Sequence, residues 1–285
     1  MREIRVSQQA VAQPLSRYLR GRFPGVAQNI WRKAFAQRDV KRGGVRLGPN
    51  DLVGPGDVLA VFISDAYLDA PLEINVVYED AQIAVVDKPV DLSCQEDGRD
   101  GPTLEKWAAT KWAGALLCHR LDHDTRGLVM IGKDQASYEE VCRALGDERV
   151  IKKYRAIVRG NPGSGDEHAF LIKDARAARV SIVNKAHPAA RAIHTSYVTL
   201  KSVGPLSLVE ITLHTGRTHQ IRAHMAHLGY PLLGDDLYGS RALNKQYNVF
   251  TQQLMAYSLA FSSLFDLGGK LITLDAHFTL EGQVF

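Results

Sequence analysis

The sequence predicts an α+β protein, with a mixed, largely antiparallel sheet flanked by helices and a small α/β module at the N-terminus. Strand-like apolar runs dominate residues 73–285, and the helical patterns between them do not alternate regularly with strands. The 285 residues are 45% hydrophobic and 23% charged, which supports a sizeable core. Residues 1–62 carry eleven Arg and Lys against four Asp and Glu, although the whole chain has a net charge of only +4. We therefore divide the chain into a module at 1–63, a linker at 64–72 and a main domain at 73–285.

The module is predicted to contain two short helices and a basic turn. Residues 14–23 repeat apolar side chains at helical spacing after a Pro that suits a first helical position, and a Pro-Gly pair ends the helix. Residues 26–37 place apolar side chains on one broad face, as a second helix would. Residues 38–46 form a basic turn and strand, and a Gly-Pro-Gly-Asp turn precedes a strand at 58–62.

The main domain is predicted to begin with a hairpin formed by residues 73–78 and 82–87. A polar, Gly-containing and mobile loop follows at 91–102, and then a helix at 103–111 that Thr103 caps. The remaining expected elements are a helix at 137–145, a strand at 151–158, a loop at 161–167, strands at 192–202 and 206–214, a helix at 218–228, and strands at 254–265 and 271–280.

A charged loop at residues 119–128 (His-Arg-Leu-Asp-His-Asp-Thr-Arg-Gly-Leu) is the most informative stretch. It lies between apolar runs at 115–118 and 128–131, which are typical of buried strands. A carboxylate near a core is costly unless a cation or hydrogen-bond donors compensate it. A loop of mixed charge between core strands is therefore either a structural ion network or an active site. Loops on rigid scaffolds favour the second interpretation.

Three ordered motifs resemble those of the RluA-type RNA pseudouridine synthases. The first is His-Arg-Leu-Asp at 119–122, which is followed by a Thr and a Gly. The second is Lys-Tyr-Arg-Ala-Ile-Val-Arg-Gly at 153–160. The third is Leu-His-Thr-Gly-Arg-Thr-His-Gln-Ile-Arg-Ala-His at 213–224, which continues to residue 239. The resemblance covers the chain from about residue 72 to its end and implies a pseudouridine synthase core.

The resemblance implies an isomerase that converts uridine to pseudouridine within structured ribosomal or transfer RNA. The N1–C1′ bond breaks, the base turns and C5 joins C1′. No atoms enter or leave, so no cofactor is required. The enzyme must extrude the base from its stack and exclude water from the site. Asp122 occupies the family's acid position and could attack C1′ or abstract a proton at C2′, and the sequence leaves both routes open.

The resemblance also implies roles for residues around Asp122. Arg222 is expected to keep Asp122 ionised, with Arg217 as the second candidate, although either arginine could instead contact phosphate. Tyr154 would stack on the flipped base and could serve as an acid or a base. Arg120 would enter the space that the base leaves or hold its phosphate. The substrate-binding candidates of this domain are Arg120, Arg126, Arg217 and His219.

The module at 1–63 resembles the small RNA-binding module named after ribosomal protein S-four, which combines two helices, a basic turn and a Pro-Gly-Asp-Val segment. Gly43-Gly44 stands where that module carries a Val-Asn-Gly turn. A basic module on a slightly acidic body suits electrostatic docking on RNA, and a solvated basic face is the alternative. The candidates for RNA contact are Arg32, Lys33, Arg38, Lys41 and Arg42.

The sequence favours neither a disulfide, nor a metal, nor a membrane segment. Its three Cys are far apart, which argues against a disulfide framework and fits a reducing cytoplasm. No apolar run is long enough to span a membrane, and the N-terminus lacks the apolar core of a signal peptide. The histidines at 214–227 could bind zinc, but they fall in the third motif, so we predict no metal. We expect a cytoplasmic monomer.

Two other functions are compatible with the same residues. One is a non-catalytic RNA-binding protein on the same fold, and the other is a glycoside hydrolase that uses Asp122 and Asp124 as paired acids. The aromatic content of 8% argues against a sugar-binding groove. Two departures from the family's pattern bear on substrate choice: Arg126 replaces a small Ser or Thr, and Met255 replaces a His.

Overall fold

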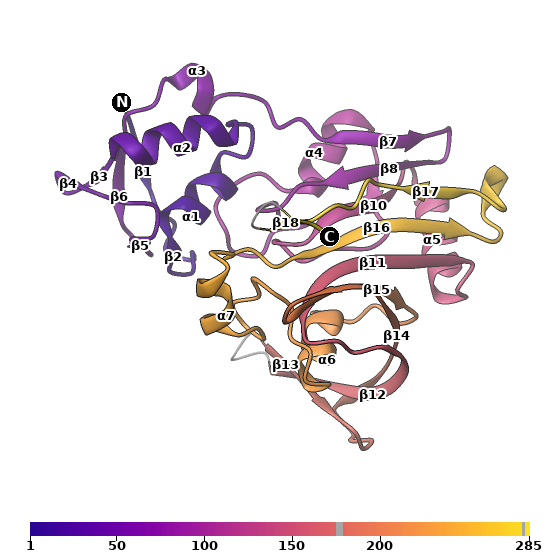
Figure 1. Cartoon of the computed structure of the whole chain (residues 1–285). Helices are drawn as coiled ribbons and strands as arrows, with labels where there is room; N and C mark the ends of the chain where they lie inside the picture. The colour runs from indigo at the N-terminus through magenta and orange to yellow at the C-terminus, as the bar shows by residue number, and fades with distance from the viewer. Residues whose placement is uncertain (175–178, 281–282) are drawn as a thin grey trace.

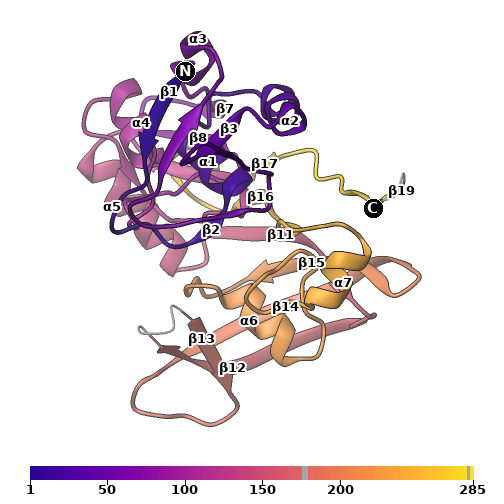
Figure 2. The same ribbon diagram turned by 90° about the vertical axis from the view of Figure 1, so that its left-hand side faces the viewer.

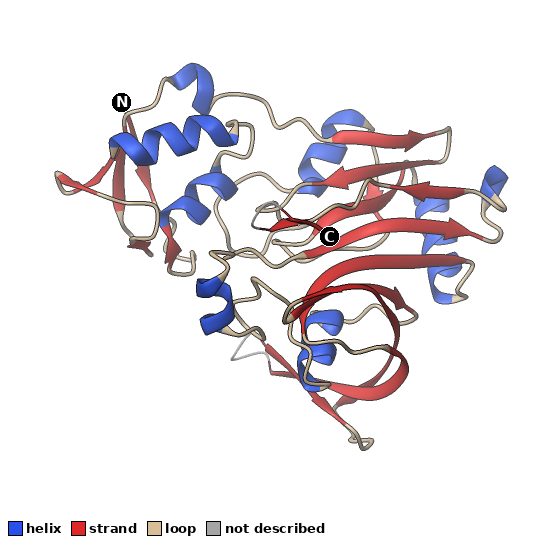
Figure 3. Ribbon diagram, viewed as in Figure 1, coloured by secondary structure: helices blue, strands red, loops and turns tan. Residues whose placement is uncertain are grey.

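The computed structural model describes residues 1–174, 179–280 and 283–285. A small sheet lies in the N-terminal module and a large mixed sheet in the main body, with helices around both (Figures 1 and 3). The predicted α+β class with a mixed, largely antiparallel sheet is therefore confirmed. Within the described residues, no helix is long and apolar enough to cross a membrane.

The N-terminal module folds around its own core, in which Trp31 and Leu15 are almost completely buried. Its elements are β1 (Arg2–Arg5), β2 (Gln13–Pro14), α1 (Leu15–Arg22), α2 (Gln28–Gln37), β3 (Val40–Arg42), β4 (Val45–Arg46), β5 (Leu52–Val53) and β6 (Val58–Val61). The small sheet has the order β1-β6-β3-β4. Gly43 and Gly44 have φ of 56° and 83° and form the tight turn between β3 and β4. Both predicted helices are confirmed, and the basic turn and strand predicted at 38–46 form two short strands joined by a turn.

The segment 64–72, predicted as a linker, packs against the module instead of running free. It contains the one-turn helix α3 (Asp65–Leu68), and Leu68 is buried in the module core. Arg2 on β1 binds Asp65 and Asp69 at 2.7 Å each, which fastens this helix to the small sheet. A single helical turn is too short to leave a periodic pattern in the sequence.

The main body is built on one curved sheet with the strand order β13-β12-β14-β15-β11-β16-β10-β8-β7. Strands β10 and β16 pair in parallel, and their other neighbours pair antiparallel. The strands are β7 (Asn75–Glu79), β8 (Ile83–Lys88), β9 (Leu116–Leu117), β10 (Arg126–Gly132), β11 (Val150–Arg159), β12 (Ser164–Asp174), β13 (Arg179–Val183), β14 (Ala190–Val203), β15 (Leu206–Leu213), β16 (Leu254–Phe261) and β17 (Leu271–Thr273). The helices are α4 (Leu104–Lys111), α5 (Gln135–Gly146), α6 (Gln220–His227), α7 (Arg241–Gln246) and the 3-10 helix η1 (Phe265–Leu267). Strands β18 (Thr279–Leu280) and β19 (Gln283–Val284) form a short hairpin.

Helices α4 and α5 cover opposite faces of the sheet at β8 and β10. Val129 and Ile131 on β10 pack in the same cluster as α4, whereas Leu128 and Met130 pack with α5. Because both faces are buried, β10 reads as an unbroken apolar run rather than an alternating one. Helix α6 lies inside the curve formed by β12–β15 (Figures 1 and 2). The predicted N-cap is confirmed, since Thr103 Oγ1 accepts a hydrogen bond from the Lys106 backbone N–H at 3.2 Å.

Several predicted boundaries in the main body are wrong. The loop predicted at 161–167 becomes strand β12 from Ser164 onward, because Gly165 leaves room for the ring of Tyr197 on the paired strand. The predicted strand at 254–265 ends at Phe261 and leads into η1, and the one at 271–280 breaks after Thr273. Strand β13 and helix α7 had no prediction.

The loop at 91–102, predicted as polar and mobile, carries apolar side chains into the main core. Leu92 is fully buried and Cys94 nearly so, and both belong to the cluster that also contains α4. The many polar residues around Leu92 and Cys94 in the sequence gave no sign that these two side chains are buried.

Candidate active site

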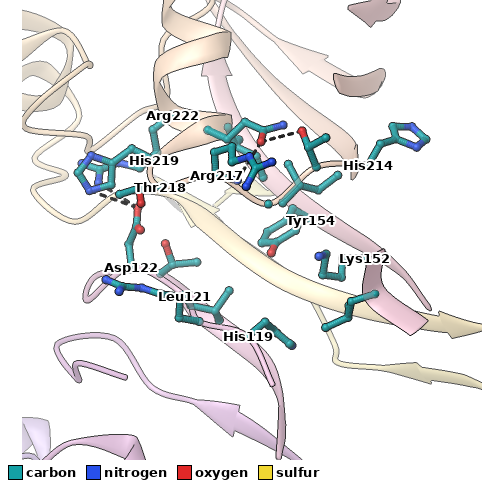
Figure 4. Close-up of a pocket in the computed structure, with 18 of the residues that line it drawn as sticks. His119, Leu121, Asp122, Lys152, Tyr154, His214, Arg217, Thr218, His219 and Arg222 are labelled. Atoms are coloured by element: carbon teal, nitrogen blue, oxygen red, sulfur yellow. Dashed lines mark hydrogen bonds and ion pairs between the residues drawn. The ribbon is translucent and has the colours of Figure 1, made fainter. Parts of the chain in front are cut away.

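A cleft of about 540 Å³ opens in the main body beside the charged loop at 119–128. It is lined by residues 118–122 of that loop and its lead-in strand, by Lys152 and Tyr154 on β11, and by residues 213–222 around the start of α6 (Figure 4). All three motifs found in the sequence therefore meet at one cavity.

The sheet register explains how these distant segments meet. Tyr154 on β11 pairs with Ala256 on β16, and Ala256 pairs with Gly127, near the end of the charged loop, where β10 has already begun. A Cβ atom on Gly127, whose φ is 129°, would lie 2.1 Å from the Ala256 carbonyl oxygen, so only Gly allows this close strand contact. The register shifts between Lys153 and Tyr154, a bulge of the kind often found beside active sites.

A buried lysine binds backbone carbonyl oxygens in and near the charged loop. Lys88 Nζ donates to the backbone carbonyl oxygens of Pro89 (2.8 Å), Leu92 (2.7 Å) and His123 (3.1 Å). Burial lowers the pKa of Lys88 to about 8, against the effect of nearby acidic groups. Within the loop, the Thr125 backbone N–H donates to the Asp122 carbonyl oxygen at 3.0 Å, which closes a turn. These bonds fix the backbone that carries Asp122.

Asp122 contacts an arginine that a second carboxylate holds in place. Arg222 Nη1 donates to Asp122 Oδ2 at 3.1 Å. The same guanidinium forms a two-pronged pair with Asp235, with Nε–Oδ2 at 2.6 Å and Nη2–Oδ1 at 3.0 Å. Burial alone would lower the pKa of Arg222, but the hydrogen bonds and charges of Asp235 and Asp122 raise it. Arg222 is therefore a fixed cation at the carboxylate, as predicted for it in preference to Arg217.

His219 approaches the same oxygen of Asp122 as Arg222 does. Its Nε2 atom is 3.8 Å from Asp122 Oδ2, and its Nδ1 atom is 3.1 Å from the hydroxyl of Tyr238. Burial lowers the pKa of His219, although the charge of Asp122 opposes this effect. The ring is therefore neutral at neutral pH. His219 also has a positive φ of 53°, an uncommon conformation for a residue with a side chain.

Tyr154 is buried in the wall of the cleft, and its hydroxyl points into the cavity (Figure 4). Burial, together with the charge of Asp122, raises the pKa of Tyr154 well above its usual value. The phenol keeps its proton at neutral pH, so it can donate a hydrogen bond or stack on a ring. The structure therefore disfavours the predicted role of Tyr154 as a base.

Three cations line the cleft around these groups. Arg120 and Arg217 are exposed at its rim, as their predicted contact with RNA requires. Lys152 had no predicted role, although it directly precedes the second motif, and burial lowers its pKa. Arg126, predicted to bind substrate, instead pairs with Asp87 on β8 at 2.7 Å, with half of its side chain exposed. The strand that begins at Arg126 directs this side chain to β8.

The cations predicted for the module lie on α2, at the C-cap of α2 and on β3. Arg32, Lys33 and Arg38 are exposed. Lys41 lies over the ring of Phe62, with its Nζ atom 4.8 Å from the ring centroid. Arg42 donates to Asp57 Oδ2 at 2.7 Å and to the Leu52 carbonyl oxygen at 2.9 Å. Arg42 is therefore partly engaged within the module.

The paired-acid arrangement required for a glycoside hydrolase is not formed by Asp122 and Asp124. Asp124 is held by His123 Nδ1 at 2.6 Å and by Arg17 of the module. Although burial opposes it, the hydrogen bond from His123 and the charge of Arg17 lower the pKa of Asp124 far below its usual value. Asp122 lines the cleft, whereas Asp124 does not. Asp124 is a loop hydrogen-bonder instead.

The histidines do not form the zinc site considered from the sequence. His224 Nδ1 contacts Thr195 Oγ1 at 3.1 Å, and His227 Nε2 contacts Asn184 Oδ1 at 3.0 Å. His168, His194 and His214 stack in a row across β12, β14 and the end of β15, with neighbouring ring centroids 3.9 Å apart. Asp166 lies beside this row, and its carboxylate and the rings of His168 and His194 bring potential ligand atoms within 4.8 Å of one another, at a place outside the cleft and outside the histidines considered from the sequence.

The mixed sheet, the anchored carboxylate and the cation-lined cleft are those of a pseudouridine synthase, an intramolecular isomerase. The chain belongs to the RNA pseudouridylate synthase family, whose sequence model matches residues 82–227. This match contains the three motifs identified in the sequence. It begins after the module at 1–63, so the likeness of that module to ribosomal protein S-four stays a prediction.

Named relatives agree with this assignment. The chain is 31% identical to ribosomal large subunit pseudouridine synthase D of Buchnera aphidicola over 77% of this chain and 76% of the relative. It is 31% identical to ribosomal large subunit pseudouridine synthase C of Rickettsia prowazekii over 80% and 83%. The solved structure of human RNA pseudouridylate synthase domain containing 1 superposes with a TM-score of 0.59 at 25% identity, covering 71% of this chain and 83% of that one.

Proposed function

We propose that this protein isomerises uridine in the RNA of the large ribosomal subunit, with Asp122 as the catalytic carboxylate. The position of Asp122, in a cleft and against a cation that Asp235 fixes, is the observation that carries the proposal. The names of the bacterial relatives, both ribosomal large subunit pseudouridine synthases, favour ribosomal RNA over transfer RNA as the substrate. A cytoplasmic location is part of the same proposal.

The reaction needs a carboxylate at the sugar and a space in which the base can turn. Asp122 acts at the ribose, either on C1′ or on the C2′ proton, while the hydrogen bond from Arg222 orients the carboxylate. The N1–C1′ bond then breaks, the uracil turns, and C5 bonds to C1′. The C5 proton leaves and N1 gains a proton, so that the atoms balance without a co-reactant.

The cleft wall and rim have separate tasks in this proposal. The buried ring of Tyr154 stacks on the extruded uracil and shields it from water. Arg120 and Arg217 at the rim hold phosphates on either side of the extruded nucleotide. The exposed cations of the module, Arg32, Lys33 and Arg38, add a sequence-independent grip on RNA.

Tritium release from large-subunit ribosomal RNA labelled at uracil C5 tests the proposal. The wild-type protein should release tritium, and Asp122→Asn should bind the RNA without any release of tritium. Asp275→Asn, which changes an exposed carboxylate, is the matched control and should release tritium normally. Release by Asp122→Asn would remove Asp122 from the mechanism. RNA binding without release by the wild type would favour a non-catalytic RNA-binding protein.

A further inference from the structure

Helix α1 of the N-terminal module touches the loop that carries Asp122. Leu15 and Leu19 face the module core, while Arg17, Arg20 and Gly21 form a second face with helical spacing. All three residues of this second face contact the main body. The module therefore packs directly against the charged loop, in addition to being connected to the main body through residues 64–72.

Arg17 bridges two acidic residues that belong to the two halves of the active site. Its Nη2 atom pairs with Asp124, two residues after Asp122 in the charged loop. Its Nη1 atom binds Asp236 Oδ2 at 3.0 Å, directly after the Asp235 that anchors Arg222. Only 23% of the Arg17 side chain and 14% of that of Asp124 are exposed, so solvent screens this contact weakly.

Further contacts fix the angle at which α1 meets the main body. Arg20 Nε donates to Asp91 Oδ2 at 2.9 Å, and the Tyr18 hydroxyl donates to Asp100 Oδ2 at 3.0 Å. Gly101, with φ of 136°, lies so close to α1 that a Cβ atom there would be 2.3 Å from the Gly21 carbonyl oxygen. Backbone packed this tightly leaves α1 little freedom to slide along the loop.

Lys88 connects the two loops of the main body that Arg20 and Arg17 contact. Lys88 Nζ binds the carbonyl oxygens of Leu92 and His123, so it joins the loop held by Arg20 to the loop held by Arg17. The charged loop is consequently bound both by Lys88 and by α1. A shift of α1 would be transmitted to His123 and Asp124, which adjoin Asp122.

We propose that Arg17 is a positioning residue for catalysis, and that the N-terminal module completes the active site in addition to contacting RNA. The pair with Asp124 sets the charged loop, and the pair with Asp236 sets the segment that anchors Arg222, so one guanidinium fixes the distance between the two partners Asp122 and Arg222. This inference rests on the catalytic role proposed for Asp122.

Single-turnover rates with saturating enzyme separate positioning from RNA binding. Arg17→Met should lower the rate of tritium release about tenfold or more, because small displacements of reacting groups cost rate steeply. Its dissociation constant for RNA should equal that of Arg5→Met, which removes the same charge from an exposed position on β1. Arg17→Lys should restore only part of the rate, because one ammonium cannot bridge two carboxylates as a guanidinium does.

A double substitution tests whether Arg17 acts through Asp124. The rate of Arg17→Met combined with Asp124→Asn should be no lower than that of the slower single variant. If Arg17→Met fails to fold, Asp236→Asn tests the proposal, because it changes one of the two carboxylates that bind Arg17 and that carboxylate is exposed. A lowered rate of tritium release by Asp236→Asn supports the proposal. Equal rates for Arg17→Met and Arg5→Met, multiplicative effects in the double variant, or an unchanged rate in Asp236→Asn would overturn it. An active Asp122→Asn would instead overturn the proposed function itself.

Discussion

Asp235→Asn would show how much the anchor of Arg222 contributes to stability and rate. The side chain of Asp235 is fully buried, and it accepts two hydrogen bonds from Arg222 and two from the backbone N–H groups of Leu237 and Tyr238, each at 2.9 Å. Removing one partner of a buried ion pair costs about 3–5 kcal/mol. Asn keeps one oxygen for the backbone donors, and Asp122 still faces Arg222, so we expect a loss of about 3 kcal/mol, at the lower end of this range.

The effect of Asp235 on stability should also depend on pH. Burial opposes ionisation of Asp235, but the hydrogen bonds and charge of Arg222 lower its pKa below the usual value. A lowered pKa in the folded state gives stability that is complete above the unfolded-state pKa of about 3.9 and disappears as the pH falls through the folded-state pKa. The difference between wild type and Asp235→Asn should therefore be full at pH 7 and shrink below about pH 4.

Urea unfolding of both proteins at several pH values measures this difference. Asp236→Asn is the matched control, because that side chain is 60% exposed and lies 3.8 Å from Arg222, so its loss should cost no more than about 1 kcal/mol. The tritium-release rate of Asp235→Asn should fall about tenfold or more, as Arg222 loses its orientation. An Asp235→Asn protein as stable as Asp236→Asn would refute the view that Asp235 holds Arg222.

Three further predictions concern single side chains. Lys88 has a pKa lowered to about 8, so between about pH 8 and pH 10.5 the unfolded chain binds its proton more strongly than the folded one. The difference in stability between the wild type and Lys88→Met, measured by urea unfolding, should therefore shift in favour of the wild type as the pH rises across that window. Tyr154→Phe keeps the ring and should lower the tritium-release rate less than Tyr154→Ala does, and equal losses would assign the main role to the hydroxyl. Arg126→Ser, which introduces the family's usual small residue, should cost no more than about 1 kcal/mol because its pair with Asp87 is half exposed, and should leave the release rate unchanged; a large fall in rate would return Arg126 to the substrate site.

The sequence motifs located most of the cleft. Asp122, Tyr154 and Arg222 come from three separate motifs, and the structure brings them to one cavity because β10, β16 and β11 are neighbours in the sheet. Element types were also predictable wherever a helical period or a cap residue marked them, as in α1, α2 and α4. These signals are local, and the physical chemistry behind them needs no knowledge of partners distant in the chain.

The residues that escaped prediction depend on distant partners. Arg17 looks like any basic residue on a helix until the fold brings it to Asp124 and Asp236. Lys88 follows the strand predicted at 82–87 and had no predicted role, because its carbonyl partner His123 lies far away in the sequence. Arg126 is the opposite case. The sequence predicted that this loop cation contacts RNA, whereas in the structure its side chain pairs with Asp87. Charge patterns identify candidates, and the tertiary contacts determine which of them stay free.

The floor of the cleft belongs to a sheet that runs unbroken from β15 through β11 and β16 to β10. Because these strands belong to one sheet, we expect them to move little relative to one another when the cleft binds RNA. Most of the adjustment therefore falls on the nucleic acid. Uridines in hairpin loops, bulges or mismatched pairs, which cost little to unstack, should react faster than uridines locked in regular duplex.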